Sequence, residues 1–250
     1  MGVILRYRDF LATYKTRGYR IKHLENYKYL FPINSSTALA GVVADLMGDG
    51  NLQGDPIWRA DFTSKSKLEL ERFAKEIKKL FKKKCKIRKC SSNTYGKTYN
   101  SGVNCSPVAR ILLLCGVPSG QKVLKSFEIP EWIRKDKECF RRFCQRFFSC
   151  EGCIMHESNR RYPQIRLDYW KSEKLLKDGE RFIKEICKYM KHYFDIDSTI
   201  TFPINRNKRK DGIVTRPIRI YILNVSVVKF CNEIGFEGKK QKDLKALILR

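Results

Sequence analysis

Apolar and polar residues follow one order of helix-like and strand-like patterns twice along the chain. The first pass predicts a helix, a strand, a helix, a hairpin and a helix, at residues 37–47, 58–64, 67–83, 85–105 and 106–116. The second pass predicts the same order, at residues 137–150, 164–169, 172–193, 199–223 and 226–235. An internal repeat explains five elements in a shared order better than chance does.

The predicted strand after the first helix of each pass alternates between apolar and polar residues, which is typical of a strand with one buried face. The residues expected to face the core are Ala60 and Phe62, Ile165 and Leu167, and on the helix at 67–83 Leu68, Phe73, Ile77 and Leu80. In the first helix Ala40, Ala44 and Gly48 recur every four residues. This row of small side chains would let the backbone of a second helix approach closely.

The repeat divides the chain into four predicted segments. Residues 1–34 form an arm without a clear period, residues 35–117 the first half, residues 118–136 a linker apolar enough to be ordered, and residues 137–250 the second half. We therefore predict an α+β fold with two pseudo-symmetric units.

The composition narrows the class of partner. The chain has 250 residues, of which 52 are Lys or Arg and 26 Asp or Glu, for a formal net charge of +26. Such a charge favours a polyanion, and nucleic acid is the usual one. The longest apolar run, residues 111–115, is too short to span a bilayer, and residues 1–20 lack the apolar core of a signal peptide. We therefore expect an intracellular protein, in the cytoplasm, nucleoid or an organelle, that does not engage membranes.

Ten cysteines leave a metal alternative open. Several of them lie inside apolar runs, where reduced cysteine packs as a small hydrophobic residue. The candidate zinc ligands are Cys139, Cys144, Cys150, Cys153 and His156. Because only Cys150 and Cys153 have the spacing of a paired zinc motif, zinc is the less favoured interpretation.

Two acids occupy matching positions in the repeat. Asp49 and Glu151 each come directly after a predicted helix, and each is followed by glycine. If the two helices pack side by side about a pseudo-two-fold axis, both carboxylates meet at one end of the pair and offer Mg²⁺ its preferred oxygen ligands. A solvated turn before glycine is the alternative for either acid alone. Their shared register in a duplicated pattern favours the metal site.

The residues around these acids resemble a known motif. Residues 42–50, VVADLMGDG, and residues 143–152, FCQRFFSCEG, are similar to the two motifs of LAGLIDADG homing endonucleases. The linker at 116–122 and 129–133 is similar to that of two-motif members, especially archaeal and intein-type ones. The resemblance covers residues 36–236. It implies two αββαββα units whose saddle-shaped antiparallel sheets straddle the major groove of double-stranded DNA.

The resemblance also implies an activity and its site. Asp49 and Glu151 would hold Mg²⁺, for which Mn²⁺ or Ca²⁺ could substitute in binding, with the backbone carbonyls of Gly48 and Cys150 as further ligands. A monomer would hydrolyse both DNA strands across the minor groove and leave short 3′ overhangs. Lys65 and Lys171, placed just after matching strands, are the candidates for a basic residue near each scissile phosphate.

One residue departs from the motif. Copy one has Ala44 at the close-packing position, whereas copy two has Arg146. Three explanations remain open: the helix pair is splayed there, the register differs by one residue, or Arg146 reaches a phosphate.

Outward positions on the strands are the expected DNA-reading residues. Arg and Gln can contact guanine and adenine edges with two hydrogen bonds, and acids can accept from cytosine. The candidates on the strands are Arg59, Asp61, Thr63, Lys86, Arg88, Lys97, Tyr99, Gln164, Arg166, Asp168, Arg219 and Tyr221, and those in loops are Ser92, Asn93, Arg206, Asn207 and Arg209. A solvated polar face is the alternative.

The sequence therefore predicts a site-specific DNA endonuclease. The first alternative is a LAGLIDADG RNA maturase that binds intron RNA and need not cut; the paired acids disfavour it. The second is a DNA-binding regulator on the same scaffold, for which the expected additional helix-turn-helix is not found.

Overall fold

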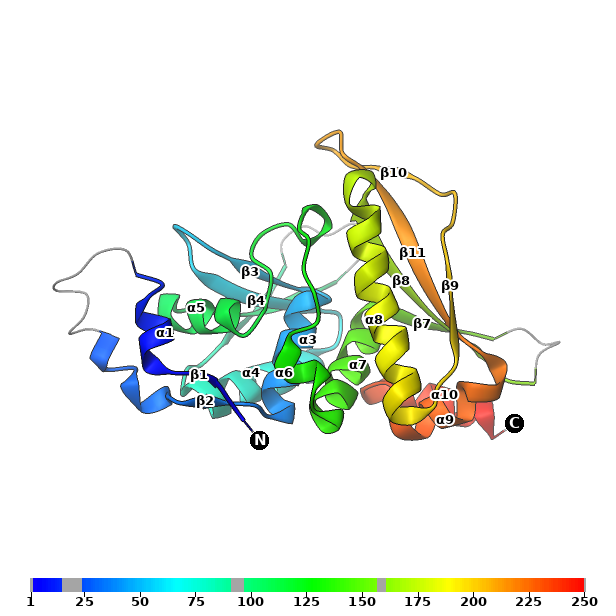
Figure 1. Cartoon of the computed structure of the whole chain (residues 1–250), viewed down its shortest axis with the longest axis horizontal. Helices are drawn as coiled ribbons and strands as arrows, with labels where there is room; N and C mark the ends of the chain where they lie inside the picture. Colours follow the sequence, from blue (N-terminus) through cyan, green and yellow to red (C-terminus); the bar gives the residue numbers. More distant parts are fainter. Residues whose placement is uncertain (1, 15–23, 91–96, 157–160, 250) are drawn as a thin grey trace. The chain divides into compact units, whose positions relative to one another are not determined.

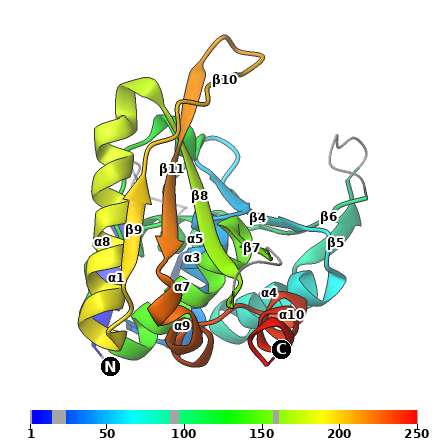
Figure 2. The same ribbon diagram turned by 90° about the vertical axis from the view of Figure 1, so that its right-hand side faces the viewer.

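The computed structural model describes residues 2–14, 24–90, 97–156 and 161–249. The chain divides into two compact units, unit 1 (Met1–Gly120) and unit 2 (Gln121–Arg250). In each unit, helices cover one face of an antiparallel sheet (Figures 1 and 2). The α+β class predicted from the sequence is confirmed.

Unit 1 consists of an arm followed by an αββαββα repeat. The arm contains β1 (Val3–Leu5), α1 (Tyr7–Leu11), the 3-10 helix η1 (Lys28–Leu30) and β2 (Ile33–Asn34). The repeat contains α3 (Thr37–Met47), β3 (Gly50–Gln53), β4 (Arg59–Ser64), α4 (Lys67–Phe81), β5 (Lys86–Lys89), β6 (Tyr99–Asn104) and α5 (Ser106–Leu114). Its strands form one sheet in the order β3-β4-β6-β5.

Helices α3 and α4 pack on the face of this sheet that carries the buried Ala60 and Phe62. Helix α3 has the predicted bounds because the Ser36 hydroxyl caps it by accepting a hydrogen bond from the Leu39 amide. The buried residues of α4 are Leu70, Phe73, Ile77 and Phe81. Leu68, predicted to face the core, is instead 77% exposed, because it lies about 200° around the helix from Leu70.

The arm packs against α5 of the same unit. Strands β1 and β2 pair with each other, and the Phe10 and Phe31 rings lie 5.2 Å apart between their centroids. The Arg110 guanidinium of α5 donates a hydrogen bond to the backbone carbonyl of Thr13. The arm is therefore an ordered part of unit 1 where the structure describes it.

Unit 2 has the same repeat with additions. It begins with the 3-10 helix η2 (Lys122–Leu124) and α6 (Glu131–Arg134). The repeat contains α7 (Lys137–Glu151), β7 (Gly152–Met155), β8 (Gln164–Ser172), η3 (Glu173–Leu175), α8 (Leu176–Phe194), β9 (Ser198–Thr201), β10 (Asn207–Lys208), β11 (Val214–Ile222), η4 (Asn224–Ser226) and α9 (Val227–Glu233), and α10 (Gly238–Ile248) follows. The sheet has the order β10-β11-β8-β7, and β9 also pairs with β11.

Helix α8 lies along one face of the unit 2 sheet and contacts β8, β9 and β11 (Figure 2). Aromatic side chains fill the space between them: the Tyr169 and Phe182 rings stack with centroids 5.1 Å apart, and Phe147 of α7 packs against both. Ile165 and Leu167 are buried on this face, as predicted. The polar residues of β8 therefore lie on the opposite face.

The structure adds elements that the sequence pattern did not predict. Strands β3 and β7 follow the two motif helices directly and form one edge of each sheet. Helix α10 follows the second repeat. Among the described helices, none combines the length and apolar character needed to cross a bilayer.

Candidate metal site and nucleic-acid interface

Asp49 lies in the turn between the end of α3 and the start of β3 and is exposed. The glycine after it is required by close packing. A Cβ atom on Gly50 would lie 2.7 Å from the Leu46 Cα and 2.8 Å from the Asp61 carbonyl oxygen, and backbone atoms cannot yield as a side chain can. Gly50 therefore pins the first strand against the helix end and fixes where the acid emerges.

Glu151 is the last residue of α7 and is half-buried. A Cβ atom on the following Gly152 would lie 2.4 Å from the Phe148 carbonyl oxygen, so glycine is required here for the same reason as at Gly50. Lys240 of α10 donates hydrogen bonds to the carbonyls of Ser149 and Gly152, at 2.6 and 2.8 Å. A cation on these carbonyls fits the negative end of the helix dipole.

The two acids thus end equivalent helices and precede equivalent strands. Asp49 belongs to unit 1 and Glu151 to unit 2, so their shared metal site remains a prediction. The same holds for the carbonyls of Gly48 and Cys150 as further ligands. Carboxylate and carbonyl oxygens at a helix end are nevertheless the donor set that suits Mg²⁺.

The zinc alternative is not supported. In the described ranges, no three His, Cys, Asp or Glu side chains gather as ligands of a metal ion. Burial raises the pKa of the Cys139 thiol to about 12 and that of Cys144 well above its usual value. Zinc binds the thiolate, which burial disfavours here.

The two candidate basic residues differ in their surroundings. Lys65 directly follows β4 and is exposed. Lys171 is 1% exposed, and its ammonium donates hydrogen bonds to the carbonyls of Lys122 and Lys125, at 2.7 and 2.5 Å. Burial lowers the pKa of Lys171 to about 8. Lys171 is therefore a structural residue rather than a candidate for contacting phosphate.

The strand bounds explain this correction. Strand β8 runs on to Ser172, beyond the predicted end at residue 169, so Lys171 occupies an inward position of the strand. The two second strands carry the same Arg-x-Asp-aromatic sequence, at residues 59–62 and 166–169. In that alignment Lys171 matches Ser64, and Lys65 matches Ser172.

The polar face of the unit 1 sheet is the face opposite α4. Strand pairing aligns Arg59 with Asn104, Asp61 with Gly102, and Thr63 with Asn100, and β5 continues these rows. The residues on this face are Asn51, Gln53, Arg59, Asp61, Thr63, Lys86, Arg88, Asn100, Gly102 and Asn104. Five of them match the outward positions predicted from the sequence.

Tyr99 is on the other face. It pairs with Ser64, and in β6 it has the same parity as the buried Ser101 and Val103. The Lys67 ammonium of α4 lies 5.0 Å from the centre of its ring. The predicted strand began at Lys97, which is exposed but precedes β6, so its alternation placed Tyr99 outward and left out Asn100 and Asn104.

Hydrogen bonds hold the unit 1 polar face in place. The Arg59 Nε donates to Asp61 at 2.6 Å, and its Nη2 donates to Asn100 at 3.3 Å. Gly102 makes room for this pair, since a Cβ there would lie 2.4 Å from the Asp61 carboxylate. Asp61 is 8% exposed and orients Arg59, and its own contact with a base remains a prediction.

Unit 2 repeats this arrangement. Arg166, Asp168, Arg219 and Tyr221 lie on the polar face of its sheet as predicted, with Gln164 at the end of the same row. The Asp168 carboxylate accepts from Arg219 Nε at 2.6 Å and lies 3.0 Å from Arg166 Nη2. One carboxylate thus orients two guanidiniums, which is favourable for binding base edges or phosphates.

The loop candidates belong to unit 2 or lie outside the described residues. Arg206 is exposed and lies 3.1 Å from the Glu173 carboxylate, whereas Arg209 donates to the Gln121 side chain at 2.9 Å. Asn207 is exposed in β10. Ser92 and Asn93 are among the residues that the structure does not describe.

Arg146 is fully buried in α7. Its Nε lies 3.6 Å from the Glu237 carboxylate, which also binds Arg142. Glu237 precedes α10, and its amide donates to the Ser149 hydroxyl of α7. A buried guanidinium beside a carboxylate is not one that reaches out to a phosphate, so that explanation is excluded.

Sequence comparisons do not assign the chain an activity. No protein-family profile matches it. It is 26% identical over 250 residues to the tRNA-splicing ligase RtcB of Methanocaldococcus jannaschii, covering 91% of this chain and 25% of the ligase. It is also 26% identical over 255 residues to the RNA polymerase subunit Rpo1N of that organism, covering 94% of this chain and 18% of the subunit. The chain spans a quarter or less of these relatives.

Solved structures decide the fold. The homing endonuclease I-WcaI bound to its DNA recognition sequence aligns with a TM-score of 0.56 and 13% identity, over 97% of both chains. The chain has the LAGLIDADG homing endonuclease fold. A single-substitution variant of I-DmoI in complex with its target DNA and Mn aligns at a TM-score of 0.50 and 14% identity, over 82% of this chain and 96% of that one. The DUF199/WhiA protein of Thermatoga maritima also aligns, at 0.52 and 14% identity, over 88% and 63%. The solved structures that resemble this chain thus include two homing endonucleases and the DUF199/WhiA protein, whose name does not denote a nuclease.

Proposed function

We propose that the chain is a site-specific DNA endonuclease that uses a divalent metal to hydrolyse both strands of a long target. The observation that carries this proposal is the repeated arrangement of an acid at the end of each motif helix and an oriented Arg-x-Asp pair on each sheet. Two DNA-bound endonucleases of similar fold support it.

Each acid has a defined role in this proposal. Asp49 and Glu151, with the carbonyls of Gly48 and Cys150, would hold Mg²⁺. When bound, the metal would activate a water molecule and neutralise charge on the phosphate. Lys65, exposed beyond β4, would stabilise the negative charge of a nearby phosphate. The Arg59 and Arg219 guanidiniums, each fixed by a carboxylate, would bind the groove in a set register.

Neither relative's activity is carried over to this chain. A tRNA ligase and a polymerase subunit perform unrelated reactions, yet both match more than nine-tenths of this chain. The segment that the ligase and the polymerase subunit share with this chain is therefore independent of the reaction that either protein catalyses. We therefore propose that the matching region is a separate endonuclease segment in these hosts, as in the intein-type proteins that the sequence resembles.

Cleavage of a library of long duplexes tests the function. We expect the protein with Mg²⁺ to cut one target class and leave short 3′ overhangs, which sequencing of the ends detects. Chelation of the metal should stop the reaction. Asp49→Asn/Glu151→Gln, purified in parallel, controls for contaminating nucleases. Failure to cut any duplex, together with selective binding of an intron RNA, would overturn the proposal in favour of the maturase.

A further inference from the structure

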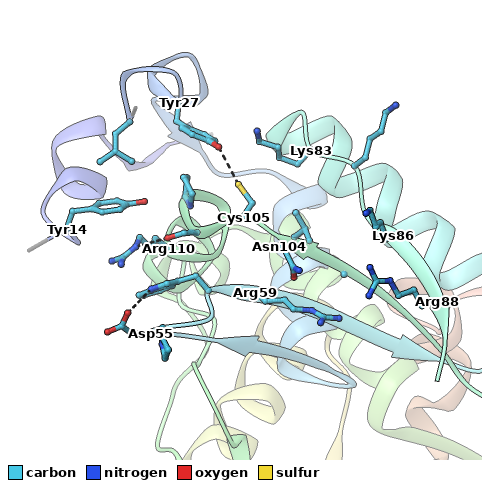
Figure 3. Close-up of a pocket in the computed structure, with 18 residues that line it drawn as sticks. Tyr14, Tyr27, Asp55, Arg59, Lys83, Lys86, Arg88, Asn104, Cys105 and Arg110 are labelled. Atoms are coloured by element: carbon cyan, nitrogen blue, oxygen red, sulfur yellow. Dashed lines mark hydrogen bonds between the residues drawn. The ribbon is translucent and has the colours of Figure 1, made fainter. Parts of the chain in front are cut away.

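A large cavity lies in unit 1, next to the polar face of its sheet (Figure 3). Its volume is about 990 Å³. The arm provides one wall, through Tyr14, Leu24 and Tyr27, and α5 provides another, through Arg110. The arm lies outside the αββαββα repeat, so the proposed cleavage site does not account for this cavity.

Basic residues far outnumber acidic ones in the lining of the cavity. The basic lining residues are Arg59, Lys83, Lys84, Lys86, Arg88 and Arg110, against a single carboxylate, Asp55. Asp55 accepts a hydrogen bond from the Trp58 indole at 3.3 Å. Arg59 pairs with Asp61, whereas among the described residues no salt bridge to a carboxylate involves Lys84, Lys86 or Arg88. Three of the six cations that line the cavity thus have no carboxylate partner in the described part of the chain.

Aromatic rings hold two of these cations in place. The Arg110 guanidinium lies 4.1 Å from the centre of the Tyr14 ring and 3.8 Å from that of Trp58. Trp58 has a φ of 47°, a left-handed conformation that is costly for a bulky residue and is often retained at binding sites. The Lys83 ammonium lies 4.9 Å from the Tyr27 ring centre. The Lys83 ammonium donates a hydrogen bond to the Tyr27 hydroxyl, and this bond raises the pKa of Lys83.

The cavity continues the polar face of the sheet. Arg59, Lys86 and Arg88 belong to both, as Figure 3 shows for these side chains beside Asn104. A polyanion that lies along the sheet would therefore enter the cavity without a break. Because guanidinium and ammonium groups already take one face of Tyr14, Trp58 and Tyr27, the cavity suits phosphates better than stacked bases.

We propose that this cavity binds the phosphodiester backbone of duplex DNA that flanks the segment read by the unit 1 sheet. The proposal rests on the proposed function, because it assigns the flank of the same DNA target. The arm precedes the repeat of unit 1, so this contact lies beyond the segment of DNA that the unit 1 sheet reads.

The salt dependence of binding tests the contact directly. The pocket variant is Lys83→Gln/Lys84→Gln, and the matched control is Lys75→Gln/Lys78→Gln, which removes the same charge from exposed positions of α4. Both variants are measured on a random-sequence duplex, so no target or cleavage is needed. Each lost phosphate contact lowers the slope of log K against log salt by about 1, so the pocket variant should lose about 2 and the control nearly none.

Footprinting locates the contact. The footprint is taken on a duplex that the wild-type protein is found to cut. Hydroxyl-radical protection of the DNA that flanks the unit 1 half-site should be lost in Lys83→Gln/Lys84→Gln and kept in the control variant. An unchanged slope with intact flank protection would overturn the cavity assignment while leaving the nuclease in place. Loss of intron RNA binding without any change on duplex DNA would overturn it in favour of RNA. A wild-type protein that binds duplex but never cuts would overturn the nuclease alone.

Discussion

Lys171 carries a charge inside unit 2 because its ammonium satisfies two backbone carbonyls of the segment at residues 122–125. The Phe127 ring, whose centre lies 4.1 Å from the ammonium, adds a cation–π contact. The Lys122 carbonyl belongs to η2, the first element of unit 2. Lys171 therefore ties the start of unit 2 to its sheet.

A pH-dependent stability follows from this burial. The pKa of Lys171 falls from 10.5 to about 8, so between these pH values the unfolded chain binds a proton that the folded one lacks. The free energy of unfolding should therefore rise with pH across that window, by on the order of 2 kcal/mol. Urea unfolding at pH 8 and pH 10, compared with Lys171→Met, measures the rise. The same pH dependence in both proteins would contradict it.

At the scale of residues, the sequence predicted the positions of the two acids, but it did not predict correctly the strand face of every side chain. Asp49 and Glu151 were identifiable because glycine follows each in a repeated frame, and the structure shows why glycine is needed there. Tyr99 was assigned to the wrong face because the predicted strand began at Lys97, and Lys171 was placed after a strand that continues to Ser172. The repeated Arg-x-Asp sequence is the signal that would have aligned the two units correctly.

Helix α10 supports the end of the second motif helix. Lys240 binds two carbonyls that flank Glu151, and Gln241 accepts from the Phe236 amide and donates to the Cys231 carbonyl. The helix thus joins α9 to the C-terminal end of α7. The Lys240 bonds therefore hold the backbone on either side of Glu151.

Removal of the Lys240 cation should weaken this support. Lys240→Met leaves two partly buried carbonyls without their charged donor, which should lower the free energy of unfolding by about 2 kcal/mol. It should also raise the Mg²⁺ concentration needed for cutting, because Glu151 is less well held. Lys239→Met, an exposed neighbour, is the control. Equal urea midpoints and metal dependence for both variants would show that Lys240 is not needed.

At the scale of elements, long periodic helices were predicted better than short strands. Helix α3 was predicted to the residue because it has a serine cap and a continuous apolar run. Strands β3 and β7 each have four residues and begin with glycine, which has low strand propensity, so no alternation marks them. Helix α10 buries only Leu244 among its own residues, so its sequence lacks a clear apolar face.

At the scale of the whole molecule, the net charge of +26 and the repeat together support the proposed function. Each unit places oriented guanidiniums on an open sheet face, and unit 1 adds the cationic cavity beside its arm. The repeat was visible in the sequence because hydrophobic periodicity is local. The cavity was not, because it depends on contacts between residues far apart in the chain.

In the proposed function, Asp49 and Glu151 serve one metal-dependent reaction that cuts both DNA strands. The decisive measurement is the rate at which each strand of a target duplex is cut, with both DNA ends labelled. Asp49→Asn and Glu151→Gln should each slow double-strand cutting by at least about a hundredfold while binding is retained, and Glu71→Gln, an exposed acid of α4, should cut normally. Unimpaired double-strand cutting by either acid variant would contradict the account.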